Sequence, residues 1–288
     1  MKKILSLLLI TLTLSACPSS KPPRVEKTPI NQPPPKVALA LGGGAAKGFA
    51  HIGVIKVLEA EGIKVDIVTG TSAGAVVGSI YAAGRNASQL EQEALALDKF
   101  DLADFVLSRK GLIKGEKLQN YINSKVGNKP LQSLPRKFAA VATDMDTGDM
   151  IIFSRGNTGQ AVRASASIPN VFQPVVIGNK SYVDGGLAAP VPVTAARKMG
   201  GQIVIAVDIS AKPKSGYGNH YLGIFDQMIN IMSVPALKQE LSRADVIIRP
   251  DISKLGSTNF NQRQEAIKLG EEAARKALPQ IRAALKGR

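Results

Sequence analysis

Cysteine, histidine and tryptophan are almost absent from this chain of 288 residues, which has one Cys, two His and no Trp. One cysteine cannot close an internal disulfide, and so few Cys and His residues cannot build a structural zinc site or an iron–sulfur cluster. The 44% of apolar residues are enough to bury a full core at this length. We therefore expect a domain that folds by hydrophobic burial, without disulfides, a structural zinc site or an iron–sulfur cluster, and no cofactor is predicted.

Aromatic residues are also scarce, at 5%, although 37 Lys and Arg residues face only 22 Asp and Glu. Proteins that bind nucleic acid usually interleave basic residues with stacking aromatics or carry a known module, and neither is visible here. The net charge of +15 instead suits an anionic lipid surface or lipid substrate, or it is a solvated basic surface without a specific partner. We expect no nucleic-acid partner.

The first 16 residues have the pattern of an export signal. A basic start, Met1-Lys2-Lys3, precedes an apolar run, Ile4 to Leu14, that is too short for a permanent membrane span. Together with the following Ser15-Ala16-Cys17, the stretch resembles a bacterial lipoprotein signal peptide with its lipobox. The resemblance implies cleavage before Cys17 and lipidation of Cys17, and the alternative is a plain secretory signal with an incidental cysteine.

A proline-rich stretch follows the cysteine. Residues 18–36 hold seven of the 17 prolines, a composition that favours extended polyproline II and cannot pack a core. The residue after the cysteine is Pro18 and not Asp, which by the habit of bacterial lipoproteins implies the outer membrane, facing the periplasm, over the inner membrane. The predicted organisation is a signal peptide at 1–16, a lipidated Cys and tether at 17–36, and a folded domain at 37–288, anchored to the cell envelope without spanning a membrane.

From residue 37 onward, short apolar runs alternate with longer helical stretches. A strand at 37–41, a glycine-rich turn and a helix at 49–61 are followed by a strand at 65–69, residues 70–74 and a helix through 83. This alternation predicts an α/β fold with a mostly parallel sheet covered on both faces by helices. Further strands are predicted at 138–143, 150–154, 175–177, 181–183, 203–209 and 245–249, with hairpins around 147–149 and 178–180 that make the sheet mixed. A last helix is predicted at 262–286, and Pro279 is expected to bend or break it.

The strongest chemical signal is Gly70-Thr71-Ser72-Ala73-Gly74, between a predicted strand and a predicted helix. A tight turn of this kind exposes the serine oxygen at the helix N-terminus, where the helix dipole favours developing negative charge. Side chains in place of Gly70 and Gly74 would clash in the turn. The context favours Ser72 as a nucleophile over a capping serine in a glycine-rich helix start.

A serine nucleophile needs a base, and histidine is the usual one. His51 falls early in a predicted helix and His220 in the polar stretch 212–221, so neither stands in an obvious strand-end loop. Asp184 ends a short predicted strand, and Gly185 and Gly186 behind it let the backbone approach another loop closely. Asp184 is therefore the favoured base, and a plain Asp-Gly turn is the alternative.

The run Gly42-Gly43-Gly44-Ala45-Ala46-Lys47-Gly48 is a third motif. It is not a dinucleotide fingerprint, because Lys47 stands where the third glycine is needed, and its lysine precedes Gly48 where a P-loop would have the reverse order. What remains is a row of bare backbone N–H groups that opens a helix and suits an oxyanion. Lys47 is expected either to neutralise a substrate phosphate or to point into solvent.

With Ala164-Ser165-Ala166-Ser167-Ile168-Pro169, these motifs resemble the patatin-like phospholipase family, in that family's order and over most of residues 37–207. The resemblance implies a three-layer α/β/α sandwich with a mostly parallel, mixed sheet, no catalytic metal, and a serine–aspartate dyad with Ser72 as nucleophile and Asp184 as proton acceptor. The implied oxyanion hole is Gly43, Gly44 and Ala45, and the implied supporting positions are Gly42, Lys47, Gly48, Gly70, Gly74, Gly185 and Gly186. The loop has one Ala more than the family's short form, so either Gly42 or Gly43 begins the oxyanion triplet.

The activity that the resemblance implies is hydrolysis of lipid acyl esters through an acyl-Ser72 intermediate, as a phospholipase A, lysophospholipase or esterase. An acyltransferase or thioesterase with the same dyad is one alternative, and a lipoprotein that binds lipid without catalysis is another. The expected partners are a phospholipid or lysophospholipid substrate and a membrane surface reached through lipidated Cys17.

Overall fold

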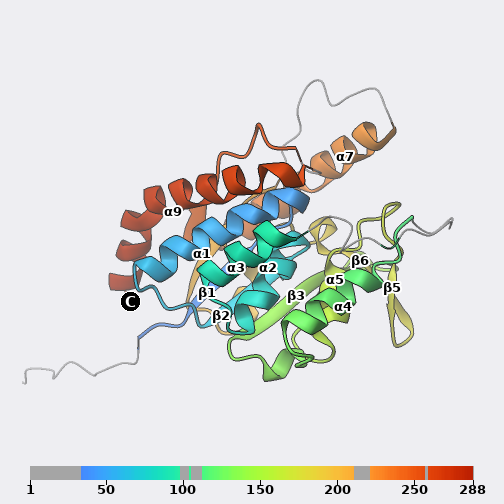
Figure 1. The fold of residues 1–288 in the computed structure, drawn as a ribbon, viewed down its shortest axis with the longest axis horizontal. Helices are drawn as coiled ribbons and strands as arrows, with labels where there is room; N and C mark the ends of the chain where they lie inside the picture. Colours follow the sequence, from blue (N-terminus) through green and yellow to red (C-terminus); the bar gives the residue numbers. More distant parts are fainter. Residues whose placement is uncertain (1–33, 98–103, 105–111, 211–220, 257–258, 288) are drawn as a thin grey trace, which may run out of the picture. The chain divides into compact units, whose positions relative to one another are not determined.

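An eight-stranded sheet organises the computed structural model, which describes residues 34–97, 104, 112–210, 221–256 and 259–287 (Figure 1). The predicted signal peptide, Cys17, most of the predicted tether and His220 lie outside these residues. Each strand pairs with the next in the series β5 (Val175–Ile177), β6 (Lys180–Asp184), β3 (Lys137–Asp144), β2 (Ile67–Thr71), β1 (Val37–Leu41), β7 (Ile203–Val207) and β8 (Val246–Ile248), and β4 (Met150–Phe153) also pairs with β3.

The centre of the sheet is parallel and one end is antiparallel. β1 pairs in parallel with β2 and β7, β2 with β3, and β7 with β8, whereas β4 and β6 run antiparallel to β3 and β5 runs antiparallel to β6. β1 lies between β2 and β7, so chain order reverses direction across the sheet at β1. In open α/β sheets the ligand binds outside the carboxyl ends of the strands at such a point.

Helices cover both faces of the sheet because successive strand residues point to opposite sides. Leu39, Leu41 and Ile205 share one core with residues of α1, α2, α3 and α9, and these four helices lie over the same face in Figure 1. Ala40 and Ala206 share a second core on the other face with residues of α6 and α8. The helices are α1 (Ala50–Ala60), α2 (Ala73–Ala82), α3 (Ala87–Ala96), α4 (Glu116–Lys125), α5 (Thr158–Ser165), α6 (Val193–Lys198), α7 (Tyr221–Met232), α8 (Val234–Leu241) and α9 (Arg263–Lys286). The predicted three-layer α/β/α architecture is confirmed.

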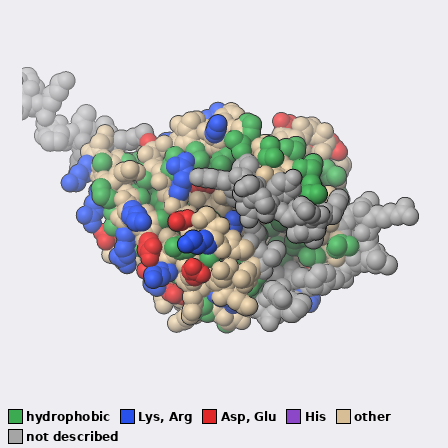
Figure 2. All heavy atoms as spheres, turned by 90° about the horizontal axis from the view of Figure 1, so that it is seen from above, with side chains coloured by type: hydrophobic (Ala, Val, Ile, Leu, Met, Phe, Trp, Pro, Cys, Tyr) green, Lys and Arg blue, Asp and Glu red, His purple; other side chains and the backbone are tan. Residues whose placement is uncertain are grey.

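Apolar residues are also exposed on α7. Ile224, Met228, Ile231 and Met232 of this helix are all close to half exposed or more, and apolar side chains are visible at the corresponding end of the molecule in Figure 2, whereas Lys and Arg side chains gather toward the other end. No helix in the described ranges is both long enough and apolar enough to cross a membrane.

Two glycines allow α1 and α9 to touch backbone to backbone. A Cβ atom on Gly53 would lie 1.9 Å from the Ile267 carbonyl oxygen, and one on Gly270 would lie 2.0 Å from the Ala50 carbonyl oxygen. Only residues without side chains fit such a contact. α9 continues through Pro279, so the helix does not break there, which was one of the two expected effects. Proline removes one helical hydrogen bond, and the burial of Ala277 and Ile281 on either side of it holds the helix against the core.

β2 differs from its predicted bounds in a way that affects the site. Its strand is displaced by two residues toward the C-terminus, because Gly70 and Thr71 pair with Ala140 and Val141 of β3. Glycine disfavours a strand in isolation, but the neighbouring strand overrides that preference. β2 consequently runs up to the residue that precedes Ser72.

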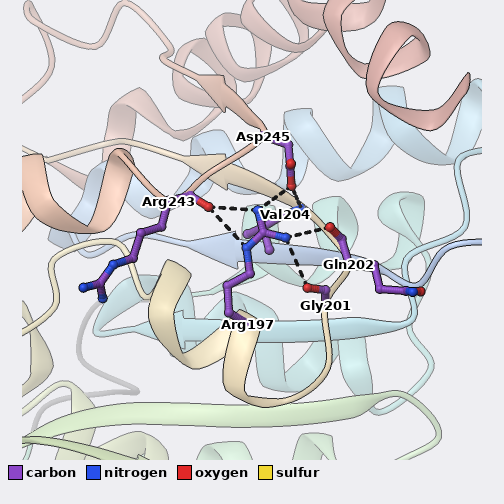
Figure 3. Close-up of polar contacts among 6 residues, drawn as sticks. All are labelled: Arg197, Gly201, Gln202, Val204, Arg243 and Asp245. Carbon is purple, nitrogen blue, oxygen red and sulfur yellow. Dashed lines mark hydrogen bonds and ion pairs between the residues drawn. The ribbon is translucent and has the colours of Figure 1, made fainter. Parts of the chain in front are cut away.

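Arg197 ties two turns together at the amino ends of β7 and β8 (Figure 3). Its guanidinium donates to three carbonyl oxygens and one carboxylate, those of Gly201, Gln202, Arg243 and Asp245. Each planar guanidinium nitrogen has a partner in this arrangement, which fixes the geometry of both turns. This polar cluster lies at the amino ends of the parallel strands, on the side of the sheet opposite their carboxyl ends.

Candidate active site

β2 and β6 follow one another along the same edge of β3. Val141 of β3 pairs with Thr71, the last residue of β2, and the next residue, Ala142, pairs with Asp184, the last residue of β6. β4 pairs with some of the same β3 residues as β2 and β6 do, and a strand residue can pair with only one neighbour on each side. β4 therefore lies on the opposite edge of β3. Because β2 and β6 end next to each other along the same edge of β3, Asp184 lies beside the point where the chain leaves the sheet at Ser72.

Ser72 lies in a backbone conformation that few residues other than glycine adopt. Its φ is 53° and its ψ is −120°, between the end of β2 and the start of α2. The turn is tight, since a Cβ on Gly70 would lie 2.4 Å from the Gly74 carbonyl oxygen and one on Gly74 would lie 2.1 Å from the Leu41 carbonyl oxygen. Strain of this kind persists only where the surrounding structure enforces it, and it is typical of a nucleophile elbow.

Asp184 is a buried carboxylate with one oxygen satisfied and one not. Its Oδ1 accepts the Gly186 N–H at 2.7 Å, and its main-chain carbonyl accepts the Thr143 hydroxyl at 2.9 Å. The Ser72 side chain lies close enough to lower the pKa of the carboxyl, yet Oδ2 has no hydrogen bond of ordinary geometry within the described residues. Oδ2 is therefore the oxygen that remains available to take a proton.

The surroundings of Asp184 make it a stronger base than a free aspartate. Burial raises the pKa of Asp184 from 3.8 to about 6, and the nearby Ser72 side chain and the Gly186 N–H oppose that rise. Desolvation disfavours the charged form, so the proton is held more tightly. At pH 7 the carboxylate is still mostly ionised, and a base of this strength is suited to general base work near neutral pH.

The end of α5 and the residues just after it hold both Ser72 and Asp184. The Ser165 hydroxyl accepts the Ser72 N–H at 2.9 Å and donates to the Val141 carbonyl at 2.5 Å, and the Ser167 carbonyl accepts the Asp184 N–H at 2.9 Å. Ser165 and Ser167 are both fully buried. Both serines belong to the predicted motif, but the sequence assigns them no role because their partners come from distant parts of the chain.

The glycine-rich loop contacts Ser72 at Gly43, where a Cβ would lie 3.2 Å from the Ser72 Cβ. The Gly42 N–H donates to the Val207 carbonyl at 3.0 Å, and the Gly43 N–H, predicted as an oxyanion donor, instead donates to the Pro190 carbonyl at 2.9 Å. This contact, made by the loop before α6, engages the Gly43 amide. Of the predicted donors, the amides of Gly44 and Ala45 have no acceptor within the described part of the chain.

The conformation of Ala45 suits an exposed donor. Ala45 is exposed, has a φ of 50° and opens a short 3₁₀ helix, η1 (Ala45–Phe49), that leads into α1. Backbone N–H groups at a helix start point outward and carry partial positive charge, which favours an anion. Gly44 cannot carry a side chain here, because a Cβ would lie 2.7 Å from the Ile209 carbonyl oxygen.

The remaining predicted positions also have identifiable surroundings. Lys47 is only 8% exposed, so it does not point into solvent. A Cβ on Gly48 would lie 2.7 Å from the Ala73 Cβ at the start of α2, and a Cβ on Gly185 would lie 2.1 Å from the Val141 carbonyl oxygen. A Cβ on Gly186 would lie 3.0 Å from Asp184 Oδ1. These glycines therefore allow the loops that carry Ser72 and Asp184 to approach their neighbours.

His51 does not take the position of a catalytic base. It is fully buried in α1, and its Nε2 lies 2.8 Å from the Gly42 carbonyl oxygen. Burial lowers the pKa of His51 to about 4, although the contact with Gly42 opposes the shift. Among the described residues, no group of three or more His, Cys, Asp and Glu side chains is arranged to hold a metal ion.

Known proteins resemble this chain in sequence and in fold. It is 32% identical over 269 residues to the uncharacterized NTE family protein Rv2565 of Mycobacterium tuberculosis, covering 84% of this chain and 46% of that protein. It is also 32% identical over 198 residues to mouse patatin-like phospholipase domain-containing protein 6, covering 65% of this chain and 15% of that protein. This chain thus spans less than half the length of either relative.

The solved structures agree on the fold. VipD of Legionella pneumophila superposes with a TM-score of 0.62 at 15% identity, covering 86% of this chain and 67% of that chain. ExoU of Pseudomonas aeruginosa superposes with a TM-score of 0.50 at 16% identity, covering 88% of this chain and 53% of that chain. The family model of patatin-like phospholipases matches residues 39–197, a range that includes the glycine loop, the Ser72 turn and Asp184. The chain therefore belongs to the patatin-like phospholipase family.

Proposed function

We propose that this protein hydrolyses acyl esters of phospholipids or lysophospholipids, with Ser72 as nucleophile and Asp184 as base. The observation that carries the proposal is the position of Asp184 Oδ2, which is buried and lacks an ordinary hydrogen bond beside the strained Ser72 turn. A buried carboxylate with an unsatisfied oxygen lowers the stability of the fold. Its presence here is explained if this oxygen accepts the proton of the Ser72 hydroxyl during the reaction. Membership of the patatin-like phospholipase family supports a lipid ester as substrate.

The reaction proceeds in two halves. In the first, Asp184 takes the Ser72 hydroxyl proton while the serine oxygen attacks the ester carbonyl, and the N–H groups of Gly44 and Ala45 hold the oxyanion. The leaving alcohol departs with the proton from Asp184. In the second half, Asp184 takes a proton from water, the hydroxide attacks the acyl-serine, and the fatty acid leaves as Ser72 recovers its proton.

The test compares Ser72→Ala and Asp184→Asn with the wild-type protein on a short p-nitrophenyl ester, phosphatidylcholine and lysophosphatidylcholine. Ser79→Ala in the same helix as the Ser72 turn and Asp149→Asn on the surface are matched controls. We expect each dyad variant to lose about 1,000-fold or more in kcat and both controls to retain it. A Ser72→Ala protein with full activity would refute the proposal.

The products and binding data separate the alternatives. Release of free fatty acid identifies a hydrolase, whereas transfer of the acyl group to glycerol or a lysophospholipid identifies an acyltransferase, and preference for an acyl thioester identifies a thioesterase. A wild-type protein that binds phospholipid vesicles but hydrolyses none of the esters identifies a binding protein. The hydrolase proposal requires fatty acid as the main product in water.

We also propose that Cys17 is lipidated and anchors the protein to the bacterial outer membrane on its periplasmic side. The signal-like start and the lipobox pattern before Cys17 support this, and several acyl chains on one residue anchor a protein stably. Labelling of cells with radioactive palmitate should mark the wild-type protein and not a Cys17→Ser variant, and the variant should leave the outer-membrane fraction. Equal labelling of both proteins would contradict the proposal.

A further inference from the structure

His51 is a buried titratable residue that the proposed reaction does not use. It lies in the first turn of α1, fully buried, with its Nε2 directed at the Gly42 carbonyl oxygen at 2.8 Å. A carbonyl only accepts hydrogen bonds, so Nε2 is the protonated ring nitrogen. His51 therefore donates to the glycine loop.

The peptide unit between Gly42 and Gly43 is fixed from both sides. Its carbonyl accepts from His51, and its N–H donates to the Pro190 carbonyl at 2.9 Å. The Gly42 N–H is held in turn by the Val207 carbonyl at 3.0 Å. The next two peptide units carry the N–H groups of Gly44 and Ala45, which have no acceptor within the described ranges.

Consecutive glycines make such a fixation necessary. Glycine reaches left-handed and right-handed backbone conformations with similar ease, so a loop of three glycines does not set its own peptide orientations. If the Gly42–Gly43 peptide rotated, the direction of the following N–H groups would change with it. A donor that holds the Gly42 carbonyl therefore controls where the Gly44 and Ala45 amides point.

We propose that His51 is a positioning residue for the oxyanion hole: it locks the Gly42–Gly43 peptide so that the Gly44 and Ala45 amides face the carbonyl attacked by Ser72. This inference rests on the proposed function and adds a residue that acts through the loop and not on the substrate. Catalysis by an oxyanion hole depends on donors that are already oriented before the charge develops.

The second ring nitrogen supports the assignment. Nδ1 of His51 is buried and has no hydrogen-bond partner in the described structure. An unpaired buried polar atom destabilises a fold, and an apolar side chain of similar size would avoid that penalty. The use of histidine at this position is explained by its Nε2 donor. The low pKa of His51, about 4, keeps the ring neutral near neutral pH.

The test replaces His51 by methionine, asparagine or glutamine. Met fills similar space without a donor, Asn keeps a polar group that is too short to reach the Gly42 carbonyl, and Gln carries an amide nitrogen at nearly the distance of Nε2. In the wild-type protein and each variant, kcat and KM are measured with a short p-nitrophenyl ester. The affinity for a trifluoromethyl ketone, which mimics the tetrahedral oxyanion, is measured in the same proteins.

We expect His51→Met and His51→Asn to lower kcat about 100-fold while KM stays within about twofold of the wild-type value. The affinity for the trifluoromethyl ketone should fall by a factor similar to that of kcat. His51→Gln should restore both quantities to within about tenfold of the wild-type values. A residue that merely filled the core would give no rescue by Gln and no separation of kcat from KM. Unchanged kcat in folded His51→Met and His51→Asn proteins would overturn the inference while the proposed function stood.

A second readout does not depend on activity. The Gly43 N–H donates to the Pro190 carbonyl, so we expect it to be protected from hydrogen exchange. This protection should fall at least tenfold in His51→Met and His51→Asn but not in His51→Gln. Unfolding curves establish that each variant is folded. If the wild-type protein hydrolyses no ester, the proposed function fails, and equal Gly43 exchange in all four proteins would separately overturn the role of His51.

Discussion

Asp184 lies beside Ser72 because β6 continues along the edge of β3 that β2 leaves. Thr71 and Asp184 pair with consecutive residues of β3, Val141 and Ala142, so one strand positions both side chains. The relative position of Ser72 and Asp184 therefore depends on backbone hydrogen bonds inside the sheet and not on a mobile connection. A site on regular elements of this kind holds its geometry more accurately than one built on loops.

The pH dependence of catalysis should reflect the raised pKa of Asp184. A base must be ionised to accept the Ser72 proton, so kcat/KM should rise with pH through about 6, the pKa of Asp184, and level off above about 7. The measurement is a profile of kcat/KM against pH from 4.5 to 9 with a soluble ester. An inflection near 4, the value of a free carboxyl, would show that Asp184 in the free enzyme is not shifted.

The Ser165 hydroxyl should matter for the rate. Ser165→Ala leaves the Ser72 N–H and the Val141 carbonyl without their shared partner, which should lower kcat about 10- to 100-fold and the free energy of unfolding by about 1–3 kcal/mol. The matched control is Ser167→Ala, because Ser167 holds Asp184 through its main-chain carbonyl and not through its hydroxyl. Equal kcat in both variants would show that the Ser165 hydroxyl does not support the Ser72 turn.

Asp184 should destabilise the native state at neutral and alkaline pH. Its pKa is higher in the folded protein, about 6, than the ordinary 3.8, so the native state binds the proton more tightly and loses stability as pH rises from about 4 to about 6. Asp184→Asn removes the buried charge and should raise the free energy of unfolding by about 1–3 kcal/mol at pH 8, but by little at pH 4. Urea denaturation at both pH values checks this, with Asp149→Asn as a surface control. A gain of the same size at both pH values would contradict it.

The contact between α1 and α9 should not tolerate a methyl group. Gly270→Ala places a Cβ 2.0 Å from the Ala50 carbonyl oxygen, so the helices must separate, and we expect a loss of about 1–3 kcal/mol or more in unfolding free energy. The matched control is Gly287→Ala at the end of the same helix, where φ is −83° and the nearest atom would lie at 3.4 Å. Thermal melting compares the two, and equal melting temperatures would show that the contact is not tight in solution.

Local patterns in the sequence were sufficient to predict the sheet and the main motifs. The alternation of apolar strands with helices, the glycines around Ser72 and the position of Asp184 at a strand end all depend on neighbouring residues, and the predicted fold class and family are confirmed. The bounds of β2 were displaced, because pairing of Gly70 with β3 outweighs the intrinsic preference of glycine.

Features that depend on distant segments were not predicted. The Gly43 amide is engaged by the Pro190 carbonyl, and Ser165 connects Ser72 to Val141, but nothing in the local sequence signals either contact. The sequence places His51 in a helix and so argues against it as a base, but its contact with the Gly42 carbonyl forms only when α1 packs against the loop. Hydrogen bonds across the fold decide which backbone donors remain free, so the oxyanion donors cannot be assigned from the motif alone.

The contact between α1 and α9 also determines what a shortened chain would lack. Ser72 and Asp184 both precede α9, so a chain that ended before Arg263 would still contain both residues. It would lose the backbone of Ile267 and Gly270, which packs against Gly53 and Ala50 at the helix that carries His51. Such a chain should therefore keep both residues of the proposed dyad but lack the support behind its glycine loop.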